Sequence, residues 1–362
     1  MSLKSDNRVY LLDLFRFIAA LVVVLYHYLF RGYSADNLSD LNFSEISAYS
    51  KYGFFGINIF FIISGFVISL SIKEGSLIKF VISRVSRLYP VYWICVFLTF
   101  IVIILFGAPR FNAEVSQFIL NLSMFHNYLR IESIDGVYWT LFIEMKFYIF
   151  VIGFYLLLNK FKKLKLDYLI YTWLTLSILY VFFNELLIFR IAKAFFILDW
   201  SSYFIAGIIF YQVYNNKLNL KYFLLLSVTL LISLQHTILE TVKKANHFNT
   251  EFSPIVACSI ITLFYLLMLL VACNKLTRLN SSKFIKIGML TYPLYLLHQK
   301  IGYIIFDNLG DVVNKYVLVI STTFLMVVLS YILSGFYEPK VSYYLKSKLK
   351  QLSIKYLNVS KN

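Results

Sequence analysis

Three charged or titratable side chains interrupt an apolar segment near the start of the chain, residues 11–30, LLDLFRFIAALVVVLYHYLF. They are Asp13, Arg16 and His27. On membrane-insertion scales an Asp or Arg at the middle of a spanning helix costs roughly 2.5–3.5 kcal/mol, so such residues usually face a protein interior or a water-filled path. An imidazole there can accept and return a proton, and a guanidinium can hold an anion. The segment is therefore the first candidate for chemistry.

If residues 11–30 form a helix, Arg16 and His27 lie on one stripe of it. They are eleven positions apart, which at about 100° per residue leaves them about 20° apart around the axis. Asp13 lies about 60° away on the same side. At a rise of 1.5 Å per residue, the distance from Arg16 to His27 is about 16 Å. The two side chains can therefore act at the two ends of one polar path.

A basic cluster is expected at the Arg16 end of this path. Arg84 and Arg87, in ISRVSRLYP, come just before the third apolar window, and a helix would carry both on one face. Grouped arginines are suited to a phosphate-rich ligand. The alternative is that these two are ordinary positive residues of a cytoplasmic loop.

A cluster of histidines and carboxylates is expected at the His27 end. Glu144, in YWTLFIEMKFY, lies about two turns into the fourth window, and Asp199 and His298 fall at similar depths in the sixth and ninth windows. A carboxylate beside an imidazole fixes its tautomer and stabilises its protonated form, as a general base requires. We expect Glu144 to orient His27, although Glu144 could instead pair with Lys146 or Arg130.

The composition indicates an all-α polytopic membrane protein. Of 362 residues, 60% are hydrophobic and 14% charged, whereas a soluble chain is about 25% charged. Windows of about 20 apolar residues can cross a hydrocarbon core about 30 Å thick. Ten occur, over residues 10–30, 53–72, 88–106, 138–158, 168–188, 194–214, 219–239, 252–272, 285–306 and 314–338. We expect a transmembrane domain over 1–340 and a basic amphipathic tail over 341–362 that lies on the membrane surface.

The basic charge follows the membrane topology. The formal net charge is +16, and alternate loops and the two ends carry 22 Lys and Arg, against 8 in the remaining loops. This asymmetry predicts that both termini are cytoplasmic. It accounts for much of the charge without a nucleic-acid partner, and no metal ion is expected.

The sequence resembles the acyltransferase 3 family, integral-membrane acyltransferases of bacteria and some eukaryotes. Five segments, in order and at the expected windows, carry the resemblance over most of the chain: LDLFRFIAALVVVLYHY, GINIFFIISGFVIS, RVSRLYPVYW, YWTLFIEMKFY and TYPLYLLHQ. The resemblance implies O-acylation, usually O-acetylation, of a sugar in a cell-surface polysaccharide such as lipopolysaccharide, or in its lipid-linked precursor. It also implies acetyl-CoA as donor and the bacterial cytoplasmic (inner) membrane as location. The 16 Å path is about the length of the pantetheine arm of coenzyme A.

By this resemblance, His27 corresponds to the essential histidine of the first helix, Arg16 to its partner, and Arg84 and Arg87 to the donor-side pair. Ser64, Gly65 and Phe66 match the second motif, and we interpret Ser64 as a small helix-packing residue beside Gly65 rather than as a nucleophile. Some members carry an extracytoplasmic esterase-like domain that completes the transfer, and no such domain is recognised here. We therefore expect either that the membrane domain performs the whole transfer or that a separate protein assists it.

Two functions of another class stay open. In a proton-coupled secondary transporter, the His, Asp and Glu residues would relay protons and the arginines would bind an anionic solute. That function predicts two related halves with interrupted helices, and we find no convincing internal repeat. A flippase or polymerase of lipid-linked glycans is the other alternative, and it would not need acetyl-CoA.

Overall fold

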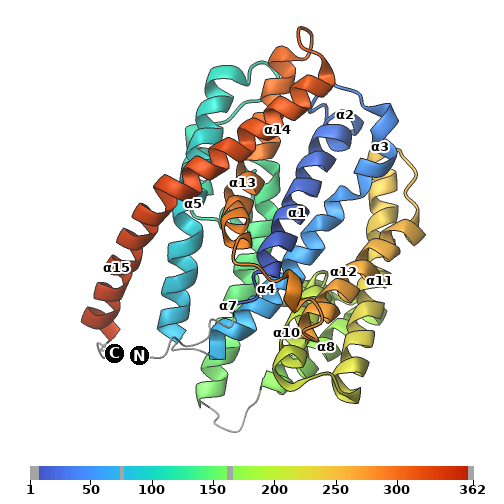
Figure 1. The fold of residues 1–362 in the computed structure, drawn as a ribbon, viewed down its shortest axis with the longest axis vertical. Coiled ribbons are helices and arrows are strands. Elements are labelled where there is room, and N and C mark those ends of the chain that lie inside the picture. Colours follow the sequence, from blue (N-terminus) through green and yellow to red (C-terminus); the bar gives the residue numbers. More distant parts are fainter. Residues whose placement is uncertain (1–7, 74–76, 161–165, 358–362) are drawn as a thin grey trace.

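The computed structural model describes residues 8–73, 77–160 and 166–357, which form helices and connecting loops and include no strand. The longer helices are α1 (Leu11–Tyr26), α3 (Ser44–Ser50), α4 (Gly56–Lys73), α5 (Leu77–Phe106), α6 (Val115–Asn121), α7 (Trp139–Lys160), α8 (Leu166–Phe183), α9 (Leu187–Phe196), α10 (Ser201–Asn216), α11 (Leu220–Phe248), α12 (Pro254–Ala272), α13 (Phe284–Leu309), α14 (Lys315–Ile332) and α15 (Glu338–Leu357). Figure 1 shows that most of them run along one common direction, as in a membrane bundle.

Eight helices of the described residues are long and apolar enough to cross a membrane. The pair α9 and α10, which meet at a bend of 49°, makes a ninth if it is counted as one span. The ninth expected window, 285–306, is α13. Its composition is not apolar enough to place it among these spans, although its 26 residues would extend about 39 Å. The prediction of an all-α protein with many apolar helices that could span a membrane is therefore confirmed, with α13 as a long but more polar helix.

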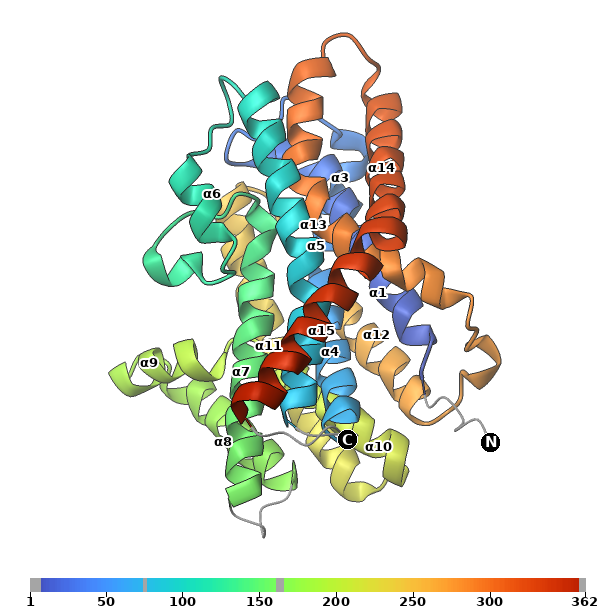
Figure 2. The same ribbon diagram turned by 90° about the vertical axis from the view of Figure 1, so that its left-hand side faces the viewer.

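The position of α13 explains its polarity. It packs against α1, α5 and α14, and Figure 2 shows it between α5 and α14. Its middle is buried, including His298 and Gln299. Because protein rather than lipid surrounds this stretch, polar side chains on it can find partners within the bundle. A helix at the centre of the bundle can therefore be more polar than a lipid-facing span.

The helices α4 and α10 cross at two glycines. A Cβ on Gly65 would overlap the carbonyl oxygen of Phe204, and a Cβ on Gly207 would overlap that of Ile62. Small residues let two backbones approach in this way inside membranes. The crossing fixes the height and rotation of α4, and with them the position of Ser64, the residue before Gly65.

Replacing Gly207 by alanine is expected to destabilise the chain by about 1–3 kcal/mol, because the added methyl meets rigid backbone. Gly153 in α7 is the matched control, since a Cβ there meets nothing within 4 Å. Thermal unfolding in detergent should show a lowered Tm for Gly207→Ala and a nearly unchanged Tm for Gly153→Ala. Equal Tm values for the two variants would contradict a close crossing at Gly207.

Arg84 and Arg87 lie inside a helix rather than in the loop before one. The third window was expected to start at residue 88, but α5 begins at Leu77 and continues through Pro90. A proline removes only one hydrogen bond of the helical ladder, and packing can compensate for that loss. The spacing of three residues therefore puts both guanidinium groups on one face of α5, as predicted.

At a second proline, Pro293, another group replaces the missing helical hydrogen bond. Pro293 cannot donate to the carbonyl of Met289 one turn earlier, and the Ser334 hydroxyl donates to that oxygen instead, at 2.8 Å. Ser334 belongs to a π-helical segment, Leu333–Tyr337, that joins α14 to α15. The described part of the expected tail, residues 341–357, is helical, and α15 packs against α5. The remaining tail residues lie outside the described ones.

Candidate functional site

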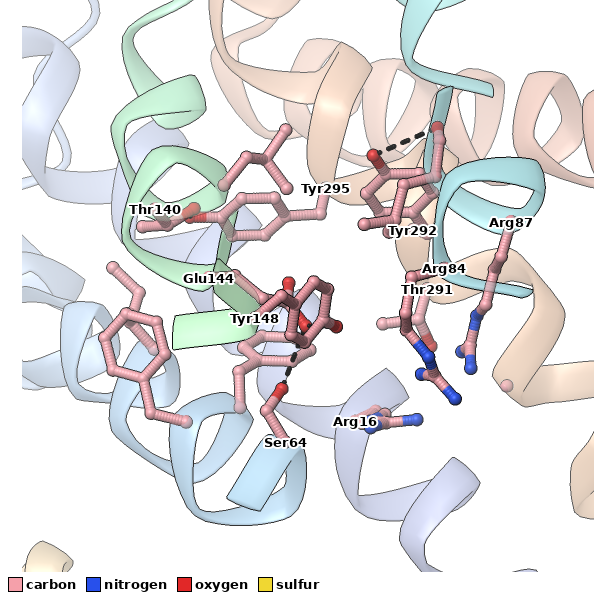
Figure 3. Close-up of a pocket in the computed structure, with 16 residues that line it drawn as sticks. Arg16, Ser64, Arg84, Arg87, Thr140, Glu144, Tyr148, Thr291, Tyr292 and Tyr295 are labelled. Atoms are coloured by element: carbon pink, nitrogen blue, oxygen red, sulfur yellow. Dashed lines mark hydrogen bonds between the residues drawn. The ribbon is translucent and has the colours of Figure 1, made fainter. Parts of the chain in front are cut away.

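A cavity lies among α1, α4, α5, α7 and α13, and Figure 3 shows the residues that line it. We call it the arginine cavity. Its polar lining consists of Arg16, Ser64, Arg84, Arg87, Thr140, Glu144, Tyr148, Thr291, Tyr292 and Tyr295, and its apolar lining of Ile57, Phe60, Phe61, Leu88 and Leu141, with Gly288. The three arginines gather on one side, Thr140 and Tyr295 lie on the other, and Glu144 and Tyr148 lie between.

The arginines carry more charge than the cavity neutralises. Three guanidinium groups line it with one carboxylate, that of Glu144. Among the residues described, neither Arg16 nor Arg87 has a carboxylate within ion-pair distance. Arg84 donates to the Ser71 hydroxyl at 3.0 Å, while its Nε is buried without a hydrogen-bond partner. The predicted basic cluster is thus present, and it has room for an anionic ligand.

Glu144 belongs to this cluster and not to His27. One of its oxygens, Oε1, accepts hydrogen bonds from the Ser64 hydroxyl at 3.0 Å and from the Tyr148 hydroxyl. No hydrogen bond joins Glu144 to His27 within the described chain, so the expected contact between them was wrong. α7 carries Glu144 one turn past Thr140 into the cavity that Arg16 lines, toward α4 and α5 and away from His27. Ser64 serves to orient this carboxylate.

A second, adjoining pocket continues the arginine cavity toward the start of α1. The two share Arg16, Arg87, Gly288 and Tyr292 in their linings, and the adjoining pocket adds Arg8, Asp13 and Glu338 among its polar residues. Asp13 was expected on the Arg16 stripe, and it lines this pocket beside Arg16. Its ion-pair partner, however, is Arg8, at 2.9 Å. Asp13 therefore leaves the charge of Arg16 unpaired.

His27 lies beside His298, 271 positions away in the sequence. The Nδ1 atom of His27 is 3.0 Å from Nε2 of His298 and 2.8 Å from the carbonyl oxygen of Val23. His27 is 6% exposed and His298 is fully buried. The prediction that both lie at similar depth is confirmed by this contact, and His298 occupies the place that we had assigned to Glu144.

Two tyrosines hold the histidine backbones together. Tyr28 of α1's continuation donates to the carbonyl of His298 at 2.7 Å, and Tyr303 of α13 donates to the carbonyl of His27 at 3.2 Å. At His27 the helix also changes from α to π geometry, over His27–Arg31. Single π-turns inside α-helices are frequent at functional sites. Sequence reasoning missed both tyrosines, because each is one of 29 in the chain.

One aromatic ring separates the arginine cavity from the histidine pair. The Tyr295 side chain lines the cavity, and its ring centroid is 5.8 Å from that of His298. Its hydroxyl is 3.0 Å from the hydroxyl of Thr140. His27 does not line the cavity. Tyr295 thus belongs to the cavity lining and also lies against His298, so the cavity and the histidine pair adjoin at this residue.

A buried carboxylate, Asp135, fastens α13 next to the pair. Its Oδ1 accepts the backbone N–H of Val137 at 3.0 Å, and its Oδ2 accepts that of Lys300, two positions after His298, at 2.8 Å. Burial raises the pKa of the Asp135 carboxyl from its ordinary 3.8 to about 6. The folded chain thus binds this proton more tightly than the unfolded chain.

The contribution of Asp135 to stability is accordingly complete below a pH of 3.8 and is lost as the pH rises through about 6. Asp135→Asn cannot titrate. We expect the stability of the wild type relative to this variant to fall by about 3 kcal/mol between about pH 4 and pH 7. Paired Tm measurements across that range test this, and a difference that does not change with pH would count against it.

Asp199 is not brought to either group. Its carboxylate pairs with Lys193 at 2.9 Å and accepts the Tyr180 hydroxyl at 2.7 Å. It lies between α9 and α10, at the bent pair, where it joins three segments. The structure gives Asp199 a packing role and does not support its predicted place near His27. Among the described residues, no three His, Cys, Asp or Glu side chains group as a metal site would require.

The family model described as "Acyltransferase domain" matches residues 9–335, nearly the whole chain. No curated protein and no solved structure gives a significant match. The matched range contains the arginine cavity and the histidine pair. The chain therefore belongs to this acyltransferase family, and its long apolar helices make it a multi-pass membrane acyltransferase.

Proposed function

We propose that this member of the acyltransferase family is an O-acyltransferase, and more specifically an O-acetyltransferase, of the bacterial cytoplasmic membrane. Its donor is acetyl-CoA and its acceptor is a sugar hydroxyl of a cell-surface polysaccharide or lipid-linked glycan. One observation carries the proposal: a cavity with three arginines and one carboxylate ends one aromatic ring away from a buried pair of histidines. A phosphate-bearing donor and a proton acceptor are what acyl transfer from coenzyme A needs.

The two pockets suit the two parts of the donor. The arginine cavity has a volume of about 100 Å³ and the adjoining pocket about 450 Å³. Pockets that enclose a whole drug-sized ligand are about 300–1,000 Å³, so a nucleotide fits only the adjoining pocket. Its phosphates would contact Arg16 and Arg87, which line both spaces. The slender pantetheine arm would then carry the thioester past Arg84 toward Tyr295.

His27 would serve as general base in a direct transfer. The acceptor hydroxyl loses its proton to His27 as its oxygen attacks the thioester carbonyl. The carbon–oxygen bond forms, the carbon–sulfur bond breaks, and the thiolate of coenzyme A takes the proton back from His27. Such a positioned base typically contributes about 10²–10⁴-fold to the rate. The two-step alternative, through an acylated residue, would give ping-pong kinetics.

The orientation of the chain in the membrane would place donor and acceptor on opposite sides of the bilayer. With both ends of the chain cytoplasmic, as the distribution of Lys and Arg favours, the adjoining pocket opens to cytoplasmic acetyl-CoA. Figure 1 is consistent with this arrangement, since α1 begins and α15 ends toward the same, lower end of the bundle. The acceptor would approach His27 from the other side, alone or delivered by a separate glycan-assembly or acyl-relay protein.

The test uses the full chain in liposomes, supplied with acetyl-CoA labelled in its acetyl group and with extracted surface glycan or lipid-linked glycan. Label should enter the glycan as free coenzyme A appears in equal amount. Absence of both, with protein that shows a cooperative unfolding transition, would overturn the proposal. Accumulation of a labelled solute inside the liposomes without any acyl donor would favour the transporter in its place.

A further inference from the structure

We infer that His298 is a positioning residue for His27: its Nε2 accepts the Nδ1–H of His27 and thereby leaves Nε2 of His27 as the free, basic nitrogen. The catalytic consequence rests on the proposed function, whereas the tautomer itself does not. In neutral histidine only one ring nitrogen carries a proton, and the partner of each nitrogen decides which. In this structure the hydrogen-bond partners of both rings determine which nitrogen of each histidine carries the proton.

The tautomer of His298 follows from backbone carbonyls. Its Nδ1 lies 2.9 Å from the carbonyl oxygen of Tyr295 and 3.2 Å from that of Leu294. A carbonyl oxygen can only accept a hydrogen bond. Nδ1 of His298 must therefore carry the proton, and its Nε2, which points to His27, has a lone pair.

The tautomer of His27 follows in turn. Both groups near its Nδ1, the carbonyl oxygen of Val23 and Nε2 of His298, are acceptors. The proton of neutral His27 consequently sits on Nδ1 and is shared between them. Its Nε2 keeps the lone pair, which is the form that can take a proton from an acceptor hydroxyl.

The rest of the structure holds this geometry. The hydroxyls of Tyr28 and Tyr303 tie each histidine carbonyl to the opposite helix. A Cβ on Gly302 would overlap the Tyr28 ring, so this close approach of α13 depends on that glycine. Since the two backbones are fixed relative to each other, the rings cannot separate without breaking several contacts.

The charges around His27 make a neutral partner important. Two cations, Arg31 in the same π-helical segment and Lys244 on α11, are near enough to act on the His27 ring. No carboxylate hydrogen-bonds to His27 among the described residues. Once His27 takes a proton, its bond to His298 becomes charge-assisted and therefore stronger. His298 thus supplies in neutral form the support that a carboxylate gives in other general bases.

Side-chain replacements separate this role from simple packing. His298→Gln places an amide oxygen close to the position of Nε2, whereas His298→Leu has similar volume and no acceptor. We expect His298→Leu to lower kcat by about 10–100-fold with little change in KM for acetyl-CoA, and His298→Gln to recover much of the loss. The inference would be overturned if His298→Leu had the same kcat as wild type, or the same kcat as His298→Gln.

The tautomer of His27 can be measured directly by NMR, without an activity assay. The chain contains five histidines, so ¹⁵N-histidine labelling and solid-state NMR in liposomes give few signals, and comparison with His27→Ala assigns those of His27. Wild type should show the proton on Nδ1 of His27. A proton on Nε2 in wild type would overturn the inference even if acyl transfer is confirmed, and a proton on Nδ1 supports it even if no transfer is found.

Discussion

Replacing His27 by alanine is expected to lower kcat for acyl transfer by about 10²–10⁴-fold, the usual contribution of a positioned general base. The expectation rests on a buried imidazole whose Nδ1 contacts two acceptors. Alanine leaves the acceptor hydroxyl without a base while the arginine cavity stays intact, since His27 does not line it. KM for acetyl-CoA should consequently change little. Rates of label transfer from acetyl-CoA to glycan, at matched protein levels, measure both quantities.

His247→Ala is the matched control for His27→Ala. The His247 side chain is 46% exposed and pairs with Asp36 near the end of α11, away from the arginine cavity. Its kcat should stay within about twofold of wild type, as expected for a surface substitution. If His27→Ala transfers label as fast as His247→Ala, the general-base mechanism is excluded, whatever the family.

Local spacing predicted the parts of the site that one helix can carry. Arg84 and Arg87 share a face because residues three apart on a helix always do, and α5 simply extends further back than expected. The stripe of Arg16 and His27 was equally accessible from periodicity. Such inferences need only the helix geometry, so they survive errors in the helix boundaries.

Depth alone failed to predict the partners across helices. Glu144 and His298 were both placed near the depth of His27, but window boundaries fix depth only to within a turn or so and say nothing about the angle around the bundle axis. The structure puts His298 against His27 and Glu144 against Ser64. The prediction for Asp199 was wrong for the same reason. Its expected depth gave no indication that it pairs with Lys193.

Two further features had no signal in a single sequence. The helix changes to π geometry over His27–Arg31, and no residue pattern in HYLFR predicts that change. Tyr295 separates the cavity from the histidine pair, although TYPLYLLHQ had drawn attention only to its histidine. Both features arise from tertiary packing, which overrides what local pattern can indicate.

The second large effect is expected from the arginines. In the double variant Arg16→Gln/Arg87→Gln, KM for acetyl-CoA should rise by about 10²–10⁴-fold, because each hydrogen bond to a charged group contributes about 1.5–3 kcal/mol. Neither side chain has a carboxylate partner within the described chain, so their replacement breaks no ion pair there. The change in kcat at saturating donor should be small. Arg190→Gln, on the exposed face of α9, provides a control of the same chemistry.

A truncated donor makes the test specific for phosphate recognition. Acetyl-pantetheine has the thioester arm of acetyl-CoA but none of its phosphates. Wild type should use it much less efficiently than acetyl-CoA, whereas the double arginine variant should treat the two donors alike, since its remaining contacts are those of the arm. This comparison is a thermodynamic cycle between protein groups and ligand groups, so their coupling is read directly. If the variant loses as much kcat/KM with acetyl-pantetheine as with acetyl-CoA, the arginines act on something other than the phosphates, and the division of the donor between the two pockets fails.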